Sequence, residues 1–388
     1  MKITRVRTTP VGFSREPLTL RQNLVSPTSI FPEPRSWFGP CSVVIAEVET
    51  DEGLTGIGTA GGFSAAAKTI IDSHLADLVL GEDPFCTELL WEKMYRATAR
   101  LGRRGVAISA ISAIDIALWD LKGKALGRPV YELIGGRTKE QIPVYASRLY
   151  AYEDLEELAH EAREFHRQGF TMLKQRFGFG PADGRAGMKR NVALVKTVRD
   201  AVGDDVALAA DAYMGWDVPY TLEMCRLLQD FDLAWIEEPL MPDAIEGYAY
   251  LSQRAPIAIS CGEHEYTRWG FKTLLDRGAA RIIQPDANRA GGISEMLKIC
   301  ALAAAADVPV VPHSNEAHNL HVIASQPICP FMEYFPDVEP DTGNEVFWKI
   351  FRGQPVAQGG RVTPSAAPGF GIEVNREAVA RLELREYV

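Results

Sequence analysis

Three short segments between residues 206 and 264 determine the fold: VALAAD (206–211), LAWIEEP (233–239) and IAISCGEH (257–264). Each is a run of apolar residues that ends in acidic ones, and segments with helical spacing separate them. Asp211 and Glu237 lie 26 residues apart, and so do Glu237 and Glu263. Strands that alternate with helices pair in parallel through right-handed crossovers. The equal spacing therefore predicts that the three acids lie at one level of a parallel sheet.

The same alternation continues over most of the chain. We expect strands at Pro143–Ala146, Met172–Gln175, Val206–Ala210, Ala234–Ile236, Ile257–Ser260, Arg281–Gln284, Val308–Pro312 and Phe331–Tyr334. Helical patterns lie between them, for example at Leu155–Gln168, Met188–Val202, Pro219–Phe231 and Ile293–Ala306. Eight strand–helix units in about 200 residues favour a (β/α)8 barrel, with its catalytic groups at the carboxyl ends of the strands. We expect this barrel to span residues 137–336.

The first 136 residues have a different pattern, typical of a small α+β domain. We expect strands at Ile3–Val11 and Cys41–Thr50, and helices at Ala65–Leu80, Thr87–Ala99 and Ala107–Leu126. A Pro- and Ser-rich loop, residues 14–40, separates the two strands. The last segment, residues 337–388, is rich in Pro and Gly, and we expect it to pack back on the N-terminal domain.

Composition excludes several classes of function. The 388 residues carry a formal net charge of −10 and no basic block, which excludes a nucleic-acid partner. The longest apolar stretch, Ile299–Ala306, is far shorter than the ~20 residues that a membrane-spanning helix needs. The N-terminus shows no signal peptide. Six cysteines without a CxxC pair favour a reducing cytoplasm over a disulfide framework or a zinc site.

Three carboxylates that face one point repel one another unless a cation lies among them. A hard divalent ion with oxygen ligands suits Asp211, Glu237 and Glu263, which indicates Mg2+. The alternative is that each acid caps the helix that follows it. Three acids in phase favour the metal site over this alternative.

The later strands add a candidate base. The sixth strand ends near Asp286 and the seventh near His313. A histidine beside an aspartate can be oriented and made more basic by it, as a general base requires. A lone histidine at this place would more often be a core residue, but the neighbouring Asp286 and the acidic cluster favour catalysis.

These residues resemble a known family. Asp211, WIEEP with Glu237, CGEH with Glu263, QPDANRAGG with Asp286 and VPHSN with His313 are similar to the enolase superfamily, mandelate racemase subgroup, as is IDIALWDLKGKALGRPV (114–130). The resemblance implies a modified, (β/α)7β-like TIM barrel with an N-terminal capping domain. It also implies one Mg2+ per subunit, removal of the proton next to a substrate carboxylate, and an even-numbered homo-oligomer such as an octamer.

The resemblance also implies roles for two further residues. Removal of that proton places a second negative charge on the substrate. A hydrogen-bond donor, a protonated Glu333 or Lys174, would stabilise this charge as it forms.

The second strand helps to choose the reaction. Racemases of the subgroup have Lys-x-Lys there, whereas this chain has Lys174-Gln175-Arg176. Arg176 is not a useful base, because its pKa lies above about 12, but it can bind a carboxylate or hydroxyl. His313 as the one base suits a dehydration that gives a 2-keto-3-deoxy acid. The alternatives are a racemase or epimerase that uses Lys174 as second base, and a non-catalytic acid-sugar-binding barrel.

Local matches concern the substrate. KQRFGFGPADGRAGMKRN (174–191), GEHE (262–265) and APGFGIEVNRE (367–377) look like the rhamnonate dehydratase group. Members of that group carry histidines in the N-terminal loops, and this chain has none before His74. We therefore expect an aldonate such as L-rhamnonate or L-lyxonate, with Arg21, Arg35 and His264 as further substrate-binding residues.

Overall fold

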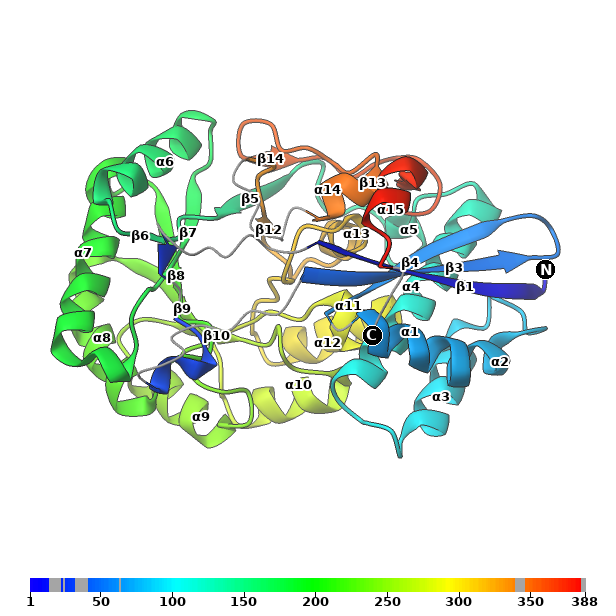
Figure 1. Ribbon diagram of the computed structural model, residues 1–388, viewed down its shortest axis with the longest axis horizontal. Coiled ribbons are helices and arrows are strands. Elements are labelled where there is room, and N and C mark those ends of the chain that lie inside the picture. The colour runs from blue at the N-terminus through cyan, green and yellow to red at the C-terminus, as the bar shows by residue number, and fades with distance from the viewer. Residues whose placement is uncertain (14–21, 24, 32–40, 63, 339–345, 385–388) are drawn as a thin grey trace.

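The computed structural model describes residues 1–13, 22–23, 25–31, 41–62, 64–338 and 346–384. A barrel of parallel strands with helices around it lies beside a smaller body made of an antiparallel sheet and helices (Figure 1). Within the described residues, no helix is both long enough and apolar enough to cross a membrane.

The N-terminal body has three antiparallel strands in the order β1-β3-β4. They are β1 (Ile3–Phe13), β3 (Cys41–Thr50) and β4 (Thr55–Gly61). The helices are α1 (Ser64–Ile70), a π-helical turn (Ile71–Leu75), α2 (Ala76–Val79), α3 (Thr87–Thr98) and α4 (Val106–Leu126). Strand β4 was not expected. Its glycines weaken the strand signal, but they are required, because a Cβ at Gly56 or Gly58 would lie 2.0 Å from a carbonyl oxygen of α4.

The barrel sheet has the strand order β11-β10-β9-β8-β7-β5-β12, and its neighbours pair in parallel. The strands are β5 (Ile142–Ser147), β7 (Met172–Arg176), β8 (Ala207–Asp211), β9 (Leu233–Glu237), β10 (Ile259–Cys261), β11 (Ile282–Ile283) and β12 (Met332–Tyr334). The last strand pairs with the first, and β14 (Arg361–Val362) adds an antiparallel partner at the start of β5. The predicted α/β barrel class is confirmed.

The seventh predicted strand is much shorter than expected. Of Val308–Pro312, only Val310 forms a parallel bridge, with Ile283. Pro309 and Pro312 flank this bridge and have no N–H group to donate to a neighbouring strand, which limits the pairing to one position.

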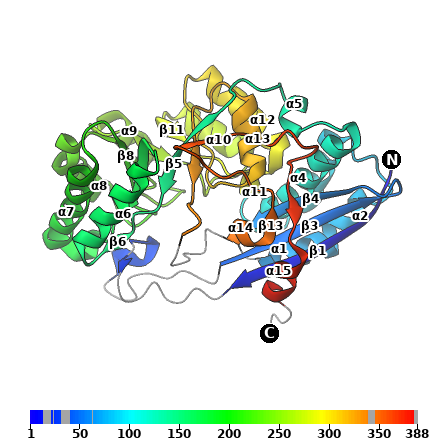
Figure 2. The ribbon, with the colours of Figure 1, turned by 90° about the horizontal axis from the view of Figure 1, so that it is seen from above.

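Helices cover the outer face of the barrel (Figures 1 and 2). They are α6 (Leu155–Arg167), α7 (Gly184–Val202), α8 (Val218–Leu228), α9 (Ile245–Arg254), α10 (Thr267–Asp276), α11 (Ala287–Ala290), α12 (Gly292–Ala305) and α13 (Ala317–Ser325). The shorter elements are β2 (Gln22–Asn23), α5 (Val130–Leu133), β6 (Ala151–Tyr152), α14 (Val346–Ile350), β13 (Phe351–Arg352), β15 (Glu373–Val374), α15 (Arg376–Leu382) and three 3-10 turns (Pro27–Ile30, Pro181–Asp183 and Gln229–Phe231).

The C-terminal segment returns to the N-terminal sheet, next to which it lies in both views (Figures 1 and 2). The amide of Leu384 donates to the carbonyl of Pro10 over 3.0 Å, and Arg376 pairs with the buried Glu47 of β3. These two contacts lie between residues 337–388 and residues 1–136, whose grouping in one domain stays a prediction. The exact division of the chain at these positions stays a prediction.

Candidate active site

The three acids with equal spacing lie at the carboxyl ends of adjacent strands. Asp211 is the last residue of β8 and Glu237 the last of β9, and the two are register partners. Glu263 follows the end of β10 by two residues. All three side chains are buried. Because neighbouring parallel strands end at one edge, the equal spacing in sequence becomes proximity in space.

Lys174 supplies much of the positive charge among these acids. Its Nζ atom pairs with Glu237, and it lies 2.7 Å from Oε1 of Glu333 and 3.9 Å from Oδ2 of Asp211. Burial alone would lower the pKa of Lys174, but the surrounding carboxylates hold it above its usual value. The ammonium group is therefore charged at neutral pH and can donate hydrogen bonds. It has little tendency to accept a proton.

The acidic set suits a divalent cation. Burial and the neighbouring carboxylates raise the pKa of Glu237 to about 7, although Lys174 opposes this rise. Burial also raises the pKa of Asp211, and repulsion from Glu263 adds to this effect. Carboxylates in this state gain stability from a hard cation with oxygen ligands, such as Mg2+. The donor set thus fits the predicted metal.

A histidine–aspartate pair lies beside the acids. Nδ1 of His313 is 2.8 Å from Oδ2 of Asp286, and Nε2 is 3.2 Å from Oε2 of Glu263. Asp286 also caps α11, since its Oδ1 accepts from the amide of Asn288 over 2.8 Å. Burial would lower the pKa of His313, but Glu263 and Asp286 raise it to about 10. The aspartate therefore fixes one ring nitrogen and leaves the other directed at the acidic cluster.

Glu333 differs from the expectation that it is protonated. Burial would raise its pKa, but Lys174 and His313 lower it to about 2, so that it is a carboxylate at neutral pH. Its Oε2 accepts from the amide of Ser314 over 2.8 Å. Of the two predicted donors at this place, Lys174 is the one that carries protons.

The predicted substrate-binding residues separate into two groups. Arg176 ends β7, with Nη2 3.2 Å from Oγ of Ser147 and Nε 3.9 Å from Asp211. His264 lies between Glu263 and a neighbouring pocket, and its side chain is about one-quarter exposed, at 23%. Arg21 and Arg35 lie outside the described residues.

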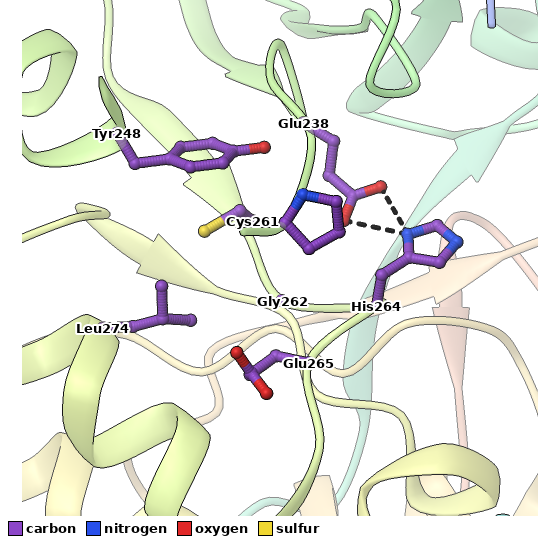
Figure 3. A pocket seen from close by; sticks show the side chains of 8 residues that line it. Glu238, Tyr248, Cys261, Gly262, His264, Glu265 and Leu274 are labelled. Carbon is purple, nitrogen blue, oxygen red and sulfur yellow. Dashed lines mark hydrogen bonds and ion pairs between the residues drawn. The ribbon is translucent and has the colours of Figure 1, made fainter. Parts of the chain in front are cut away.

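Sequence reasoning missed Glu238. Both of its carboxylate oxygens contact Nδ1 of His264, at 2.8 and 3.0 Å, as the dashed lines of Figure 3 show. Its φ of +39° is unusual for a residue other than glycine and turns the chain directly after β9. The acidic pair in WIEEP was the available signal, but strand alternation alone places its two carboxylates on opposite faces. Glu238, Glu263 and His264 offer ligand atoms within 4.8 Å of one another.

Arg289 is a second residue that sequence reasoning missed. Its Nη1 lies 3.1 Å from the carbonyl and 3.3 Å from Oε1 of Glu263, and its Nε lies 3.5 Å from Oδ2 of Asp286. Its position three residues after Asp286, one turn along α11, was the signal that could have identified it.

Comparison with known proteins relates this geometry to a family. The model of the mandelate racemase/muconate lactonizing enzyme N-terminal domain matches residues 36–135, and the enolase C-terminal domain-like model matches residues 157–378. A curated protein of Caldivirga maquilingensis, provisionally named an L-rhamnonate dehydratase, is 39% identical over 369 residues, which are 92% of this chain and 89% of that protein.

Two further relatives are also named rhamnonate dehydratases. The L-rhamnonate dehydratase of Saccharopolyspora erythraea is 36% identical over 92% of this chain and 91% of its own. The crystal structure of rhamnonate dehydratase from Gibberella zeae complexed with Mg is 35% identical, covers 98% of this chain and 96% of that one, and has a TM-score of 0.88. The chain therefore belongs to the mandelate racemase/muconate lactonizing enzyme group of the enolase superfamily, and it is an enzyme.

Proposed function

We propose that this enzyme is a Mg2+-dependent dehydratase of an acid sugar, an aldonate such as L-rhamnonate or L-lyxonate. The observation that carries the proposal is the contrast between the two sides of the site. His313 is paired through Nδ1 with Asp286 and directs Nε2 at Glu263, a predicted metal ligand, whereas Lys174 and Arg176 are cations whose pKa values the neighbouring acidic groups hold above the usual range. The names of the relatives at 36–39% identity support the same reaction class.

His313 would act first as base and then as acid. Without a cation at Glu263, that carboxylate and Asp286 raise the pKa of His313 to about 10, so that the ring holds its proton at neutral pH. A Mg2+ ion held by Glu263 would offset this carboxylate charge and let Nε2 act as a base. Nε2 would then take the proton from C2 of the aldonate, and the electron pair of the broken C–H bond would move into the substrate carboxylate to give an enediolate. Asp286 stabilises the imidazolium through Nδ1. The imidazolium then returns its proton to the C3 hydroxyl, which departs as water while the C2–C3 double bond forms. The resulting enol becomes a 2-keto-3-deoxy acid, so that the products balance the substrate minus one water.

Asp211, Glu237 and Glu263 would hold the Mg2+ ion. When bound, the ion supplies positive charge next to the substrate carboxylate, where the second negative charge of the enediolate forms. These three acids are preferred to the compact group of Glu238, Glu263 and His264, because they offer three carboxylates at the ends of three adjacent parallel strands, and oxygen ligands suit Mg2+.

The charge state of Lys174 supports dehydration over the alternative of two-base epimerisation. Carboxylates of Glu237, Glu333 and Asp211 surround its ammonium group and hold its pKa above the usual value. A lysine in this state donates hydrogen bonds to developing negative charge but cannot take a proton from C2 at neutral pH. This charge state favours a dehydratase that uses His313 alone.

Proton NMR in D2O tests the proposal. The enzyme with Mg2+ would be incubated with a panel of aldonates that includes L-rhamnonate and L-lyxonate. A 2-keto-3-deoxy product from one member supports the dehydratase and identifies its substrate. Deuterium at C2 without loss of water would indicate an epimerase instead, and an unchanged panel would contradict an aldonate dehydratase.

A further inference from the structure

A chain of buried hydrogen bonds connects the N-terminal sheet with the predicted base. Thr59 of β4 donates from Oγ1 to Oδ1 of Asn288 over 2.6 Å. Asn288 donates from Nδ2 to Oε1 of Glu316 over 2.8 Å. Thr59, Asn288 and Glu316 are each at most 2% exposed. Because the Asn288 side chain accepts at one end and donates at the other, its orientation is fixed by partners in two different parts of the molecule.

The Asn288 branch reaches Asp286. The main-chain amide of Asn288 donates to Oδ1 of Asp286 over 2.8 Å, and the other oxygen of that carboxylate contacts His313. Asn288 therefore holds one oxygen of the Asp286 carboxylate, and the other oxygen contacts the ring of His313 and lies 3.5 Å from Nε of Arg289.

The second branch reaches His313 through the main chain. Asn319 donates from Nδ2 to Oε2 of Glu316 over 3.2 Å and to the carbonyl of His313 over 2.8 Å. Its Oδ1 accepts from the amide of Ala287 over 3.3 Å. One carboxylate oxygen of Glu316 thus accepts from Asn288, which also binds Asp286. The other accepts from Asn319, which also binds the main chain of His313. The two halves of the pair are held by one buried group.

We propose that Thr59, acting through Asn288 and Glu316, is a positioning residue for the His313–Asp286 pair. Docking of β4 on the barrel then sets the direction of the base. The strand β4, absent from the sequence expectation, acquires a role in this way. The effect of Thr59 on catalysis rests on the proposed function, in which His313 is the base. The effect of Thr59 on the position of the His313 ring rests on the contacts alone.

The test compares Thr59→Val with Thr59→Ser. Valine keeps the shape of the side chain but removes the donor to Asn288, whereas serine restores it. With the aldonate that the wild-type enzyme converts, we expect Thr59→Val to lower kcat at least about 10-fold with little change in KM, because small misplacement of a catalytic group is costly. Thr59→Ser should recover most of that loss.

A spectroscopic measurement makes the test independent of turnover. The chain has seven histidines, so that histidine-selective 15N labelling gives few imidazole signals, and the loss of one in His313→Asn identifies that of His313. We expect this signal to shift in Thr59→Val and to return in Thr59→Ser. Thr8→Val is the matched control, because Thr8 on β1 of the same sheet donates over 2.6 Å to the exposed Asp72.

Each outcome decides the proposal. Wild-type kcat and an unchanged His313 signal in Thr59→Val would overturn it. It would also be overturned by a loss of kcat that Thr59→Ser does not recover, or by an equal loss in Thr8→Val. If the wild-type enzyme converts no aldonate, the proposed function fails, and the His313 signal still decides whether Thr59 positions the ring. Melting temperatures of all variants identify any that fail to fold.

Discussion

Two groups of buried carboxylates in this enzyme differ in what satisfies them. On α4, Asp115 accepts from the amide of Ser294 over 2.9 Å and from its hydroxyl over 2.6 Å. Asp120 accepts from the amides of Ile57 and Phe370 over 2.9 and 3.0 Å, and Lys124 of the same helix lies 2.6 Å from its Oδ2. Each of these acids connects α4 to another element through main-chain donors, whose positions the fold determines.

At the barrel rim, the acids mainly face cations and one another. Glu237 contacts Lys174, and Glu263 contacts His313 and Arg289. A bound metal ion could replace such side-chain cations without a change in the main chain, whereas Asp115 and Asp120 accept from main-chain amides of other elements. The difference indicates that buried acids on α4 serve stability and buried acids on the rim serve binding and chemistry.

Removal of the base should have the largest effect. His313→Asn removes the group that accepts the C2 proton and should lower kcat by at least about 10²–10⁴-fold, the usual contribution of general acid–base catalysis. Mg2+ affinity should remain, because His313 is not among the predicted ligands. Turnover of the identified aldonate and calorimetry with Mg2+ check both parts. Measurable dehydration near the wild-type rate would contradict the assignment of His313.

Loss of a rim acid should weaken metal binding. Glu237→Gln removes one negative charge from the predicted ligand set, and we expect the Kd for Mg2+ to rise by more than about 10-fold, since loss even of outer-shell partners has effects of that size. Calorimetry measures the Kd, and the rise in melting temperature with Mg2+ should shrink in parallel. An unchanged affinity would refute the ligand set. Asp115→Ala is the matched control at the other group of acids.

The same Asp115→Ala change should act on stability. It leaves the buried amide and hydroxyl of Ser294 without their acceptor, which costs about 1–3 kcal/mol for the unsatisfied amide. We expect a lower midpoint in denaturant unfolding and an unchanged Kd for Mg2+ in the folded protein. If Asp115→Ala weakened Mg2+ binding as strongly as Glu237→Gln, the distinction between the two groups of acids would not hold.

The sequence was informative about the rim for a physical reason. Parallel strands end at one edge, so that the spacing of Asp211, Glu237 and Glu263 along the chain was enough to bring them together. Strand β4 was not predicted, because its glycines weaken the strand pattern. The close approach of α4, a segment far away in the sequence, requires these glycines. The residues of β4 taken alone do not indicate that packing.

The polar contacts around the base also depended on long-range packing. The hydrogen bond between Thr59 and Asn288 joins residues 229 positions apart, and nothing in either segment indicates the other. Glu238 reaches His264 only because the chain takes a φ of +39° directly after β9. Sequence patterns therefore predicted which residue types stand at the rim, and the packing of the N-terminal sheet determines how they are oriented.

The smallest expected effect concerns a buried histidine that lies outside the barrel rim, near Phe370. His321 is fully buried, packs against Phe370 and Tyr131, and accepts from the amide of Tyr131 over 3.1 Å through Nδ1. Burial lowers its pKa from 6.5 to about 3, and repulsion from His318 adds to this effect. The rim histidine has the opposite shift, because carboxylates surround it. The two regions thus differ in the pKa shifts of their histidines as well as in the partners of their acids.

The sign of the pH dependence follows from proton binding. Below pH 6.5 the unfolded chain takes up a proton at His321, whereas the folded chain does not until the pH approaches about 3. Stability is therefore lost as the pH falls through this window, by about 1.4 kcal/mol per pH unit for one such proton. Since asparagine offers an acceptor near the place of Nδ1 but does not titrate, His321→Asn should flatten the fall of the unfolding free energy between pH 6.5 and 5. Parallel pH curves for wild type and variant would show that burial of His321 does not hold it neutral, and would place its behaviour with that of the rim.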